Sequence, residues 1–558
     1  MSLDDIKRSS DKAADESVNE PTVEDRFAAF DQPVRPEDKP GKKRRLNPRL
    51  RTLLIAAGTV VALVAVLLLI PLLPEQNAGS SAGSTGRDTL TYTLLDKTTD
   101  KKDTVAVSKA AITNESGSFT VSYHDDEDVY KLDGYEDLDL EAEKTIALTD
   151  CGSLITAMDK VQSVGKLSDY GLDKPKASAT FTYHDNTSAT LHVGNPTPTE
   201  DGYYVRLQDS GEVYVCSQSA VESFLMTAGQ FVETTLIAAP TIKTDDKDGV
   251  AVLKEVTITG AAHSKTLKLR RTSSEDKGEF LYFSHLIIEP YLRGVREDVS
   301  QSLSSFNSLV ASEAVVLHPT KQQLKEFGFD NPHTVAQMTL AVESSPKDEN
   351  SSANTSQSSE SNVTLIYYGL TKNTVRIGSL TKDNHYLVMV DGVDAIFLVA
   401  NSSLACIVER SYENTVSQLL FLKDITALSR ITVKSGGKEY PFALSHHPDE
   451  TDSDKKLTVS LNGQTTDTPQ FRTLYQLMMG LERYDTVNTL PNTEPDLSIT
   501  MYNADGSVYM STTFFPYTGS QCIVKTSEGE LFTTKTSFIT HFTEQLQNYL
   551  NGKEVLVR

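Results

Sequence analysis

The stretch YGLDKP, at Tyr170–Pro175, returns as FGFDNP, at Phe327–Pro332. The match continues downstream, where LHVGNPT around Gly194 corresponds to VRIGSLT around Gly378, and VYVCSQSAV corresponds to IFLVANSSLA. Self-similarity over such a length predicts a chain built from repeated structural units. The second copy is longer because a Ser-rich insertion, 344–362, separates two of its expected strands, and we interpret this insertion as a solvated loop.

The shared turn, Gly-x-Asp-x-Pro, has a structural explanation. We expect Gly171 and Gly328 to end a helix in the left-handed conformation, while the proline commits the chain to an extended path. Asp173 and Asp330 would then accept hydrogen bonds from local backbone amides. The competing hypothesis makes the two aspartates ligand-binding or catalytic groups.

A third copy appears when the flanking segments are compared. Each copy contains a segment that predicts a strand, a polar turn and a second strand, with apolar residues at every second position. The three segments begin at Ile112, Ile258 and Ile431. In the third copy the turn motif has diverged to LPNTEP, at Leu490–Pro495. A short closing helix is predicted after the last strand of each copy, in AVESFL, SLACIV and SFITHFTEQL.

Each copy is also predicted to hold an earlier helix, because apolar residues recur at helical spacing after a capping residue. The three apolar sets are Leu154, Met158 and Val161; Val299, Leu303, Phe306 and Val310; and Phe471, Leu474, Met478 and Leu481. The predicted fold class is therefore α+β, with tandem, mainly antiparallel sheet units that each carry a covering helix. The units are expected at 89–237, 250–425 and, in divergent form, 428–550.

One segment predicts a membrane anchor. The run from Leu53 to Pro74 holds 22 residues without a charge, which is long enough for a helix across a bilayer. Seven Lys and Arg residues lie between 39 and 51, and the positive-inside rule therefore places 1–52 in the cytoplasm as a disordered tail. Residues 75–88 would be a linker to an extracytoplasmic body, in a single-pass protein of the cell membrane. A cleaved signal peptide is the alternative.

Composition limits the classes of partner. The 558 residues carry a net charge of -23, which argues against binding to nucleic acid phosphates. No Trp is present, which weakens the prospect of a carbohydrate platform built on indole rings. The four cysteines, Cys151, Cys216, Cys406 and Cys522, are far apart and contain no CxxC pair, so they do not predict a disulfide scaffold. Cys216 and Cys522 are interpreted as buried thiols.

Signals for chemistry are weak throughout. The acidic stretch from His124 to Glu143 does not fit a calcium loop, because Gly134 at the sixth position puts Val129 at the first. Gly79–Gly83 matches GxSxG only in the linker, and neither a Walker lysine motif nor GxGxxG occurs. The adjacent pair His446 and His447 should point to opposite faces of an extended segment.

Aromatic strand residues were the last candidates for a site. Tyr203, Tyr204, Tyr214 and Tyr386 could line a ligand groove, but alternating positions in a sheet favour packing. The sequence therefore predicts no catalytic, cofactor-binding or metal-ligating residues and no cofactor.

The run YGLDKPKASATFTYHDNTSATLHVG, followed by GYYVRL and EVYVCS, resembles the bacterial DUF4340 domain family. The resemblance covers residues 90 to 425 well and the third copy only loosely. It implies a single N-terminal membrane helix and a repeated β-rich extracytoplasmic body. Members are often found beside ABC-type transporters of the gliding-motility kind, which names a candidate partner. The family has no established activity, so no catalytic residue is carried over.

Two functions remain as hypotheses. The first is a non-enzymatic, membrane-anchored interaction or scaffold protein, tethered through Leu53 to Pro74, with an ABC-type transporter or a cell-envelope component as its partner. The alternative is a cell-envelope enzyme or wall-polymer-binding protein. Converging carboxylates with raised pKa values in a cleft would favour the alternative.

Overall fold

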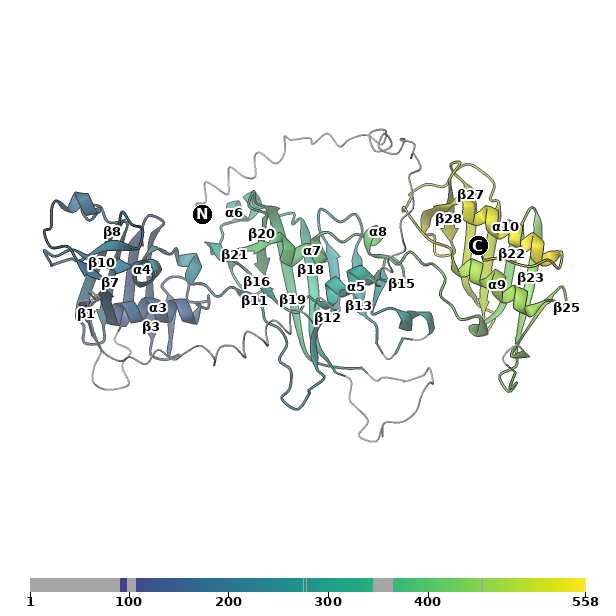
Figure 1. Ribbon diagram of the computed structural model, residues 1–558, viewed down its shortest axis with the longest axis horizontal. Coiled ribbons are helices and arrows are strands. Elements are labelled where there is room, and N and C mark those ends of the chain that lie inside the picture. Colours follow the sequence, from purple (N-terminus) through teal and green to yellow (C-terminus); the bar gives the residue numbers. More distant parts are fainter. Residues whose placement is uncertain are drawn as a thin grey trace, which may run out of the picture. The chain divides into compact units, whose positions relative to one another are not determined.

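The computed structural model describes residues 91–97, 107–273, 275–276, 278–344, 365–452 and 455–557 (Figure 1). The predicted tail 1–52, membrane helix 53–74 and linker 75–88 lie outside the described residues, as does all but the first residue of the insertion 344–362. Among the described residues, no helix is long and apolar enough to span a membrane.

Three separate antiparallel sheets dominate the structure, which confirms the predicted α+β class with mainly antiparallel sheets. The first sheet, blue in Figure 1, has the strand order β4 (Val129–Leu132), β3 (Gly117–His124), β2 (Val107–Asn114), β7 (Ala177–Tyr183), β8 (Ser188–Pro196), β9 (Gly202–Leu207), β10 (Tyr214–Ser217) and β6 (Asp159–Lys160).

The second and third sheets follow along the chain. The second has the order β15 (Arg293–Gly294), β14 (His285–Glu289), β13 (Leu267–Arg271), β12 (Val250–Thr259), β18 (Thr334–Ser344), β19 (Ile366–Leu380), β20 (His385–Val390), β21 (Ala395–Ala400) and β17 (Glu313–Leu317). The third has the order β25 (Gln464–Thr465), β24 (Leu457–Leu461), β23 (Lys438–His446), β22 (Leu428–Ser435), β26 (Leu497–Asn503), β27 (Val508–Pro516), β28 (Gln521–Thr526) and β29 (Leu531–Lys535).

These orders describe one plan used three times. The strands β2, β12 and β22 hold the same place in the three sheets. Each pairs on one side with the strand that follows it in a hairpin, and on the other side with the first strand of a four-strand meander. A short segment then lies beside the last meander strand: β6 beside β10, β17 beside β21, and residues 484–487 beside β29. We call these three assemblies, with their helices, the first, second and third units.

Two helices pack over each sheet, and their apolar faces close three separate cores (Figure 1). The pairs are α3 (Ala142–Ser153) with α4 (Gln218–Leu225), α5 (Glu297–Ser304) with α7 (Asn401–Val408), and α9 (Thr468–Met479) with α10 (Thr536–Leu550). The helices α4, α7 and α10 confirm the predicted closing helices. In α9 the cap is Asp467, with Pro at the start of the helix, and the predicted apolar set is buried.

The earlier helix of the first unit was predicted in the wrong place. The helix α3 ends at Ser153, and Leu154–Ala157 form the strand β5, which pairs with β1 (Tyr92–Asp96). Along β5 the side chains alternate between exposed and buried, and Leu154 is 45% exposed. A strand pairing far upstream overrides the local helical spacing.

In the second unit the prediction was right for half of its residues. Val299 and Leu303 lie buried in α5, but Phe306 follows the helix. Val310 is exposed in β16 (Leu309–Val310), which pairs with β11 (Thr235–Ile237). Both corrections have the same cause, because each unit takes a strand from the chain segment that precedes it.

The repeated turn has the predicted backbone. Gly171, after the 3-10 helix η3 (Leu167–Tyr170), has a φ of 68°, and Gly328, after α6 (Lys321–Glu326), has a φ of 83°. The predicted hydrogen bonds of Asp173 and Asp330 are wrong, because both carboxylates are exposed and form none with the described residues.

The matching glycine downstream of each turn also has a structural reason. A Cβ atom on Gly194 would lie 2.1 Å from the carbonyl oxygen of Tyr170, and one on Gly378 would lie 2.4 Å from that of Phe327. The turn therefore packs directly on the backbone of β8 or β19, and only glycine leaves room for it.

Candidate functional site: the junction between the second and third units

A buried carboxylate connects the second unit to the third. Glu530, in the turn before β29, is 1% exposed. Its Oε1 lies 2.7 Å from Arg483 Nη2 and accepts a hydrogen bond of 2.6 Å from the Tyr412 hydroxyl. Its Oε2 accepts hydrogen bonds from Arg293 Nη2 and Nε, at 2.9 and 3.2 Å. Because Arg293 and Tyr412 come from the second unit, this carboxylate is shared between units.

Local structure positions each donor. Arg293 lies in the two-residue edge strand β15, and Tyr412 begins α8 (Tyr412–Thr415), which the Ser411 side chain caps. The backbone amide of Glu530 donates to Thr526 Oγ1 at 3.1 Å, which fixes the turn. Arg293 and Tyr412 are thus held by short, regular elements, and Glu530 by a hydrogen-bonded turn.

Arg483 supplies the second buried cation. It is 3% exposed, and its guanidinium lies over the rings of Tyr412 and Phe532, at 5.0 and 5.1 Å from their centroids. Within the described ranges, its Nε and Nη1 have no hydrogen-bond acceptor. The ring faces carry partial negative charge and offset part of that cost.

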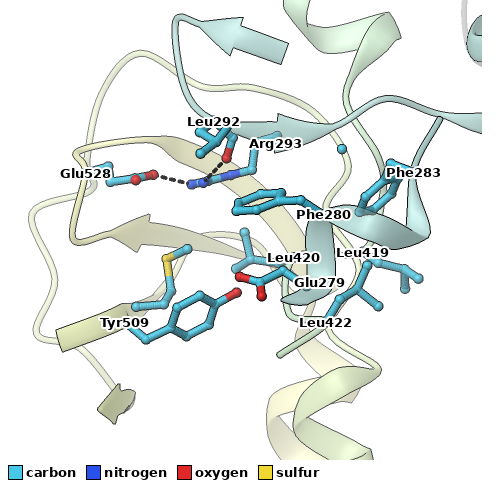
Figure 2. Close-up of a pocket in the computed structure, with 12 residues that line it drawn as sticks. Glu279, Phe280, Phe283, Leu292, Arg293, Leu419, Leu420, Leu422, Tyr509 and Glu528 are labelled. Atoms are coloured by element: carbon cyan, nitrogen blue, oxygen red, sulfur yellow. Dashed lines mark hydrogen bonds and ion pairs between the residues drawn. The ribbon is translucent and has the colours of Figure 1, made fainter. Parts of the chain in front are cut away.

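A small cavity lies beside this cluster (Figure 2). Its volume is about 90 Å³, and Figure 2 shows Arg293 bonded to Glu528 at one side, with Tyr509 facing Glu279 at the other. The Glu279 carboxylate is buried and lies 3.4 Å from Lys423 Nζ. Ligand pockets for small molecules usually measure about 300 to 1,000 Å³, so this space suits a few waters rather than a substrate.

The pKa shifts in the cluster favour fixed charges and neutral phenols. Burial and then the charge of Glu530 raise the pKa of Tyr412, and burial and then Glu279 raise the pKa of Tyr509. Burial alone would lower the pKa of Arg293, but the carboxylate charges of Glu530 and Glu528 outweigh it, and that pKa is raised. Near neutral pH Tyr412, Tyr509 and Arg293 therefore stay protonated and donate hydrogen bonds.

The fold also shifts the pKa of several carboxyl groups elsewhere in the described residues. In the described part of the chain, every carboxyl whose pKa the fold shifts is shifted downward. At Asp185, Asp201 and Asp505 the largest cause is a hydrogen bond from a Thr or Ser hydroxyl. General acids near neutral pH need a raised pKa, so these groups point away from glycosidase-like chemistry.

The other sequence candidates are accounted for by packing. The four cysteines are free thiols, and Cys216 and Cys522 are buried as predicted. His446 Nε2 donates to the Leu428 carbonyl at 2.6 Å, whereas His447 lies 3.3 Å from Thr458 Oγ1, so the two rings have different partners. No group of three or more His, Cys, Asp or Glu in the described residues could hold a metal ion, and this includes the acidic stretch 124–143.

The candidate tyrosines also pack as structural residues. Tyr203 lies against the first core, and Tyr386 is buried in the second. The ring of Tyr204 meets that of Tyr170 edge to face with centroids 5.0 Å apart, and the ring centroid of Tyr214 lies 6.1 Å from that of Tyr92. The packing interpretation of these residues is therefore confirmed.

Comparison with known proteins bears on the middle of the chain. Residues 132–332 match the family model of the domain of unknown function DUF4340. This match begins in β4 and ends after the second turn motif, so it includes both turns and the junction between the first two units. No curated protein and no solved structure matches the chain. The sequence resemblance is thus confirmed over residues 132–332, which match the DUF4340 family model.

Proposed function

We propose that the protein is a non-enzymatic, membrane-anchored interaction protein. Its three units would lie outside the membrane and present surfaces to an ABC-type transporter or a cell-envelope component. The observation that carries this proposal is the shared carboxylate of Glu530. The most buried charged cluster described joins two units and faces a cavity too small for a substrate. Its charges thus serve assembly of the body.

The anchor supports the same proposal from the sequence. The apolar run from Leu53 to Pro74 precedes the first unit with only the predicted linker 75–88 between them, and basic residues precede the run. A rigidly joined body beyond such an anchor would hold a binding surface at a fixed reach from the bilayer. The net charge of -23 suits a body that stays soluble near an anionic cell surface.

Two measurements test the proposal. Protease added to intact, wall-stripped cells should remove an epitope placed near residue 500 and spare one near residue 20, and the reverse pattern would refute the topology. Photo-crosslinkers placed at several exposed positions of the full-length chain should capture the same membrane protein repeatedly. As a control, detergent washing before irradiation should dissociate a specific complex, and the crosslinked product should then be lost. If no position gives a product, the interaction role is wrong.

A further inference from the structure

The junction between the first and second units contains a much larger cavity, of about 560 Å³. One wall is the tip of the β2–β3 hairpin, from Glu115 to Phe119, together with Asp133 and Tyr135. The other wall is the whole of β17, with Thr227–Gly229 at the base and Gln323 of α6 at the side. We call this cavity the β17 groove. Its volume lies in the range of ligand-binding pockets.

The strand β17 is an edge strand. Among the described residues, β21 is the only strand that pairs with it, and the flanking amides of Ser312 and His318 also donate toward that side, to Leu398 and Asp394. A register shift at Val315 leaves this residue without a partner in β21. An edge strand has backbone groups that a further strand can pair with, and here they line a cavity rather than open solvent.

The groove is acidic. Its lining includes Glu115, Asp133 and Glu313 and no Lys or Arg. Asp133 is paired with Lys109 at 3.1 Å, but Glu115 and Glu313 form no hydrogen bond or ion pair with any described residue. Two carboxylates therefore remain available on opposite walls, one from each unit.

Gly229 closes the groove at its base. A Cβ atom there would lie 2.0 Å from the carbonyl oxygen of Ala314, so the 3-10 helix η4 (Ala228–Phe231) rests directly on β17. This contact fixes η4 against the edge strand. The β17 wall of the groove is thus in place without a ligand.

We propose that the β17 groove binds an extended, basic segment of the partner protein by β-strand addition. Beyond the contact of η4 with Ala314, Val315–Leu317 of β17 offer about 10 Å of edge for a short strand. The backbone of the added strand would pair with β17, while Lys or Arg side chains reach Glu115 and Glu313. This inference rests on the proposed interaction function, to which it adds a surface and the chemistry of the bound segment.

Peptide binding to the full-length chain in mild detergent tests the inference. The probe is a fluorescein-labelled octapeptide of alternating Lys and Thr, followed by fluorescence anisotropy, with the Glu-Thr octapeptide as its charge-reversed control. We expect the basic peptide to bind and the acidic peptide to bind at least tenfold more weakly, about the effect of one charge-assisted contact. Hydrogen exchange should slow at the β17 amides when the basic peptide is bound.

Matched variants assign the binding to the groove. Glu115→Gln and Glu313→Gln should each weaken binding up to about fivefold, as expected for partly exposed ion pairs. Glu544→Gln, an exposed carboxylate on α10, should change nothing. A peptide with every second amide N-methylated should bind about tenfold more weakly because it loses backbone hydrogen bonds.

Three results would overturn the inference. They are a basic peptide that fails to bind the parent protein, groove variants that both bind it as tightly as the parent protein does, and an N-methylated peptide that binds as tightly as the unmodified one. The crosslinking experiment separates this failure from that of the proposed function. Products from other exposed positions but none from Ser118, in the hairpin wall, would reject the groove and retain the interaction role.

Discussion

The two junctions of this chain join units of the same strand order in opposite ways. At the first, an exposed pair, Asp137 and His318 at 2.8 Å, lies beside a polar groove of about 560 Å³. At the second, Glu530 is enclosed by donors from both units, and the cavity is about 90 Å³. A buried charge without its partner is costly, so the second contact resists opening, whereas the first leaves a surface available.

Two glutamates at equivalent positions show that burial, more than residue type, distinguishes an exposed ion pair from an enclosed one. Glu212 in SGEVYV of the first unit and Glu530 in EGELFT of the third both lie two residues before an aromatic strand residue. Glu212 pairs with Lys160, and its side chain is 48% exposed, whereas that of Glu530 is 1% exposed. The first unit thus shows how the position behaves when no preceding unit covers it.

The largest effect is expected from Glu530→Gln. The change leaves Arg293 and Arg483 buried without their shared carboxylate, which typically costs about 3 to 5 kcal/mol of unfolding free energy. Glu212→Gln, the matched change on the exposed pair, should cost far less, because solvent screens an exposed ion pair. Urea denaturation of both variants measures the difference. Equal losses would show that the second junction is no tighter than an exposed ion pair.

The next effect concerns acid stability near the second junction. His285, in β14 opposite Arg271 of β13, is 2% exposed, and neither ring nitrogen has a partner in the described residues. Burial and then Arg271 lower its pKa to about 4. The unfolded chain takes up the proton near pH 6.5, so stability should fall from there to about pH 4, by about 3 kcal/mol.

A leucine at this position tests the assignment. His285→Leu should flatten the fall in stability between pH 6.5, the ordinary His pKa, and about pH 4, the lowered pKa of His285. His447→Leu, an exposed histidine in the third unit, should leave the pH profile unchanged. If both variants follow the parent protein, the buried ring is not the group that titrates.

A smaller effect is expected at the base of the β17 groove. In Gly229→Ala the new Cβ atom meets the Ala314 carbonyl, and overpacking of this kind usually costs about 1 to 3 kcal/mol. Gly211→Ala is the matched control, because a Cβ atom there meets nothing within 4 Å. Melting curves and limited proteolysis near residue 240 report the change. Identical curves for the two variants would mean that η4 does not rest on β17.

The smallest effect belongs to the exposed pair of the first junction. Asp137→Asn removes the carboxylate that His318 contacts, and surface pairs of this type are worth less than about 1 kcal/mol. The change should leave the melting temperature within about 2 °C of the parent protein. A larger drop would show that the first junction depends on this pair and is tighter than its exposure suggests.

Local patterns predicted the strands and turns well. Alternation from Ile112, Ile258 and Ile431 and the glycines at 171 and 328 depend on neighbours in sequence, and the structure has them as expected. The spacing of Leu154, Met158 and Val161 also fits a helix, but pairing with β1 makes Leu154–Ala157 a strand. Whether this segment forms a helix or a strand depends on a partner strand far upstream, which periodicity cannot detect.

The charged junction had no signal in the sequence. Arg293 and Glu530 lie 237 residues apart, and neither belongs to a motif. The aligned Glu212 and Glu530 were visible in the repeats, but one is exposed and the other is buried. Burial of a charge depends on what covers it, and only the tertiary structure supplies that information.

The separation of Arg293 and Glu530 has a consequence for how the protein is made. Ribosomes synthesise chains from the N-terminus, so the second unit is complete well before residue 530 is added. Until then Arg293 and Tyr412 lack the acceptor that the finished protein gives them. A polypeptide truncated shortly before Glu530 would therefore carry two unmatched donors on its second unit. Arg293 and Tyr412 of the second unit therefore gain their shared acceptor only when the turn between β28 and β29 has been made.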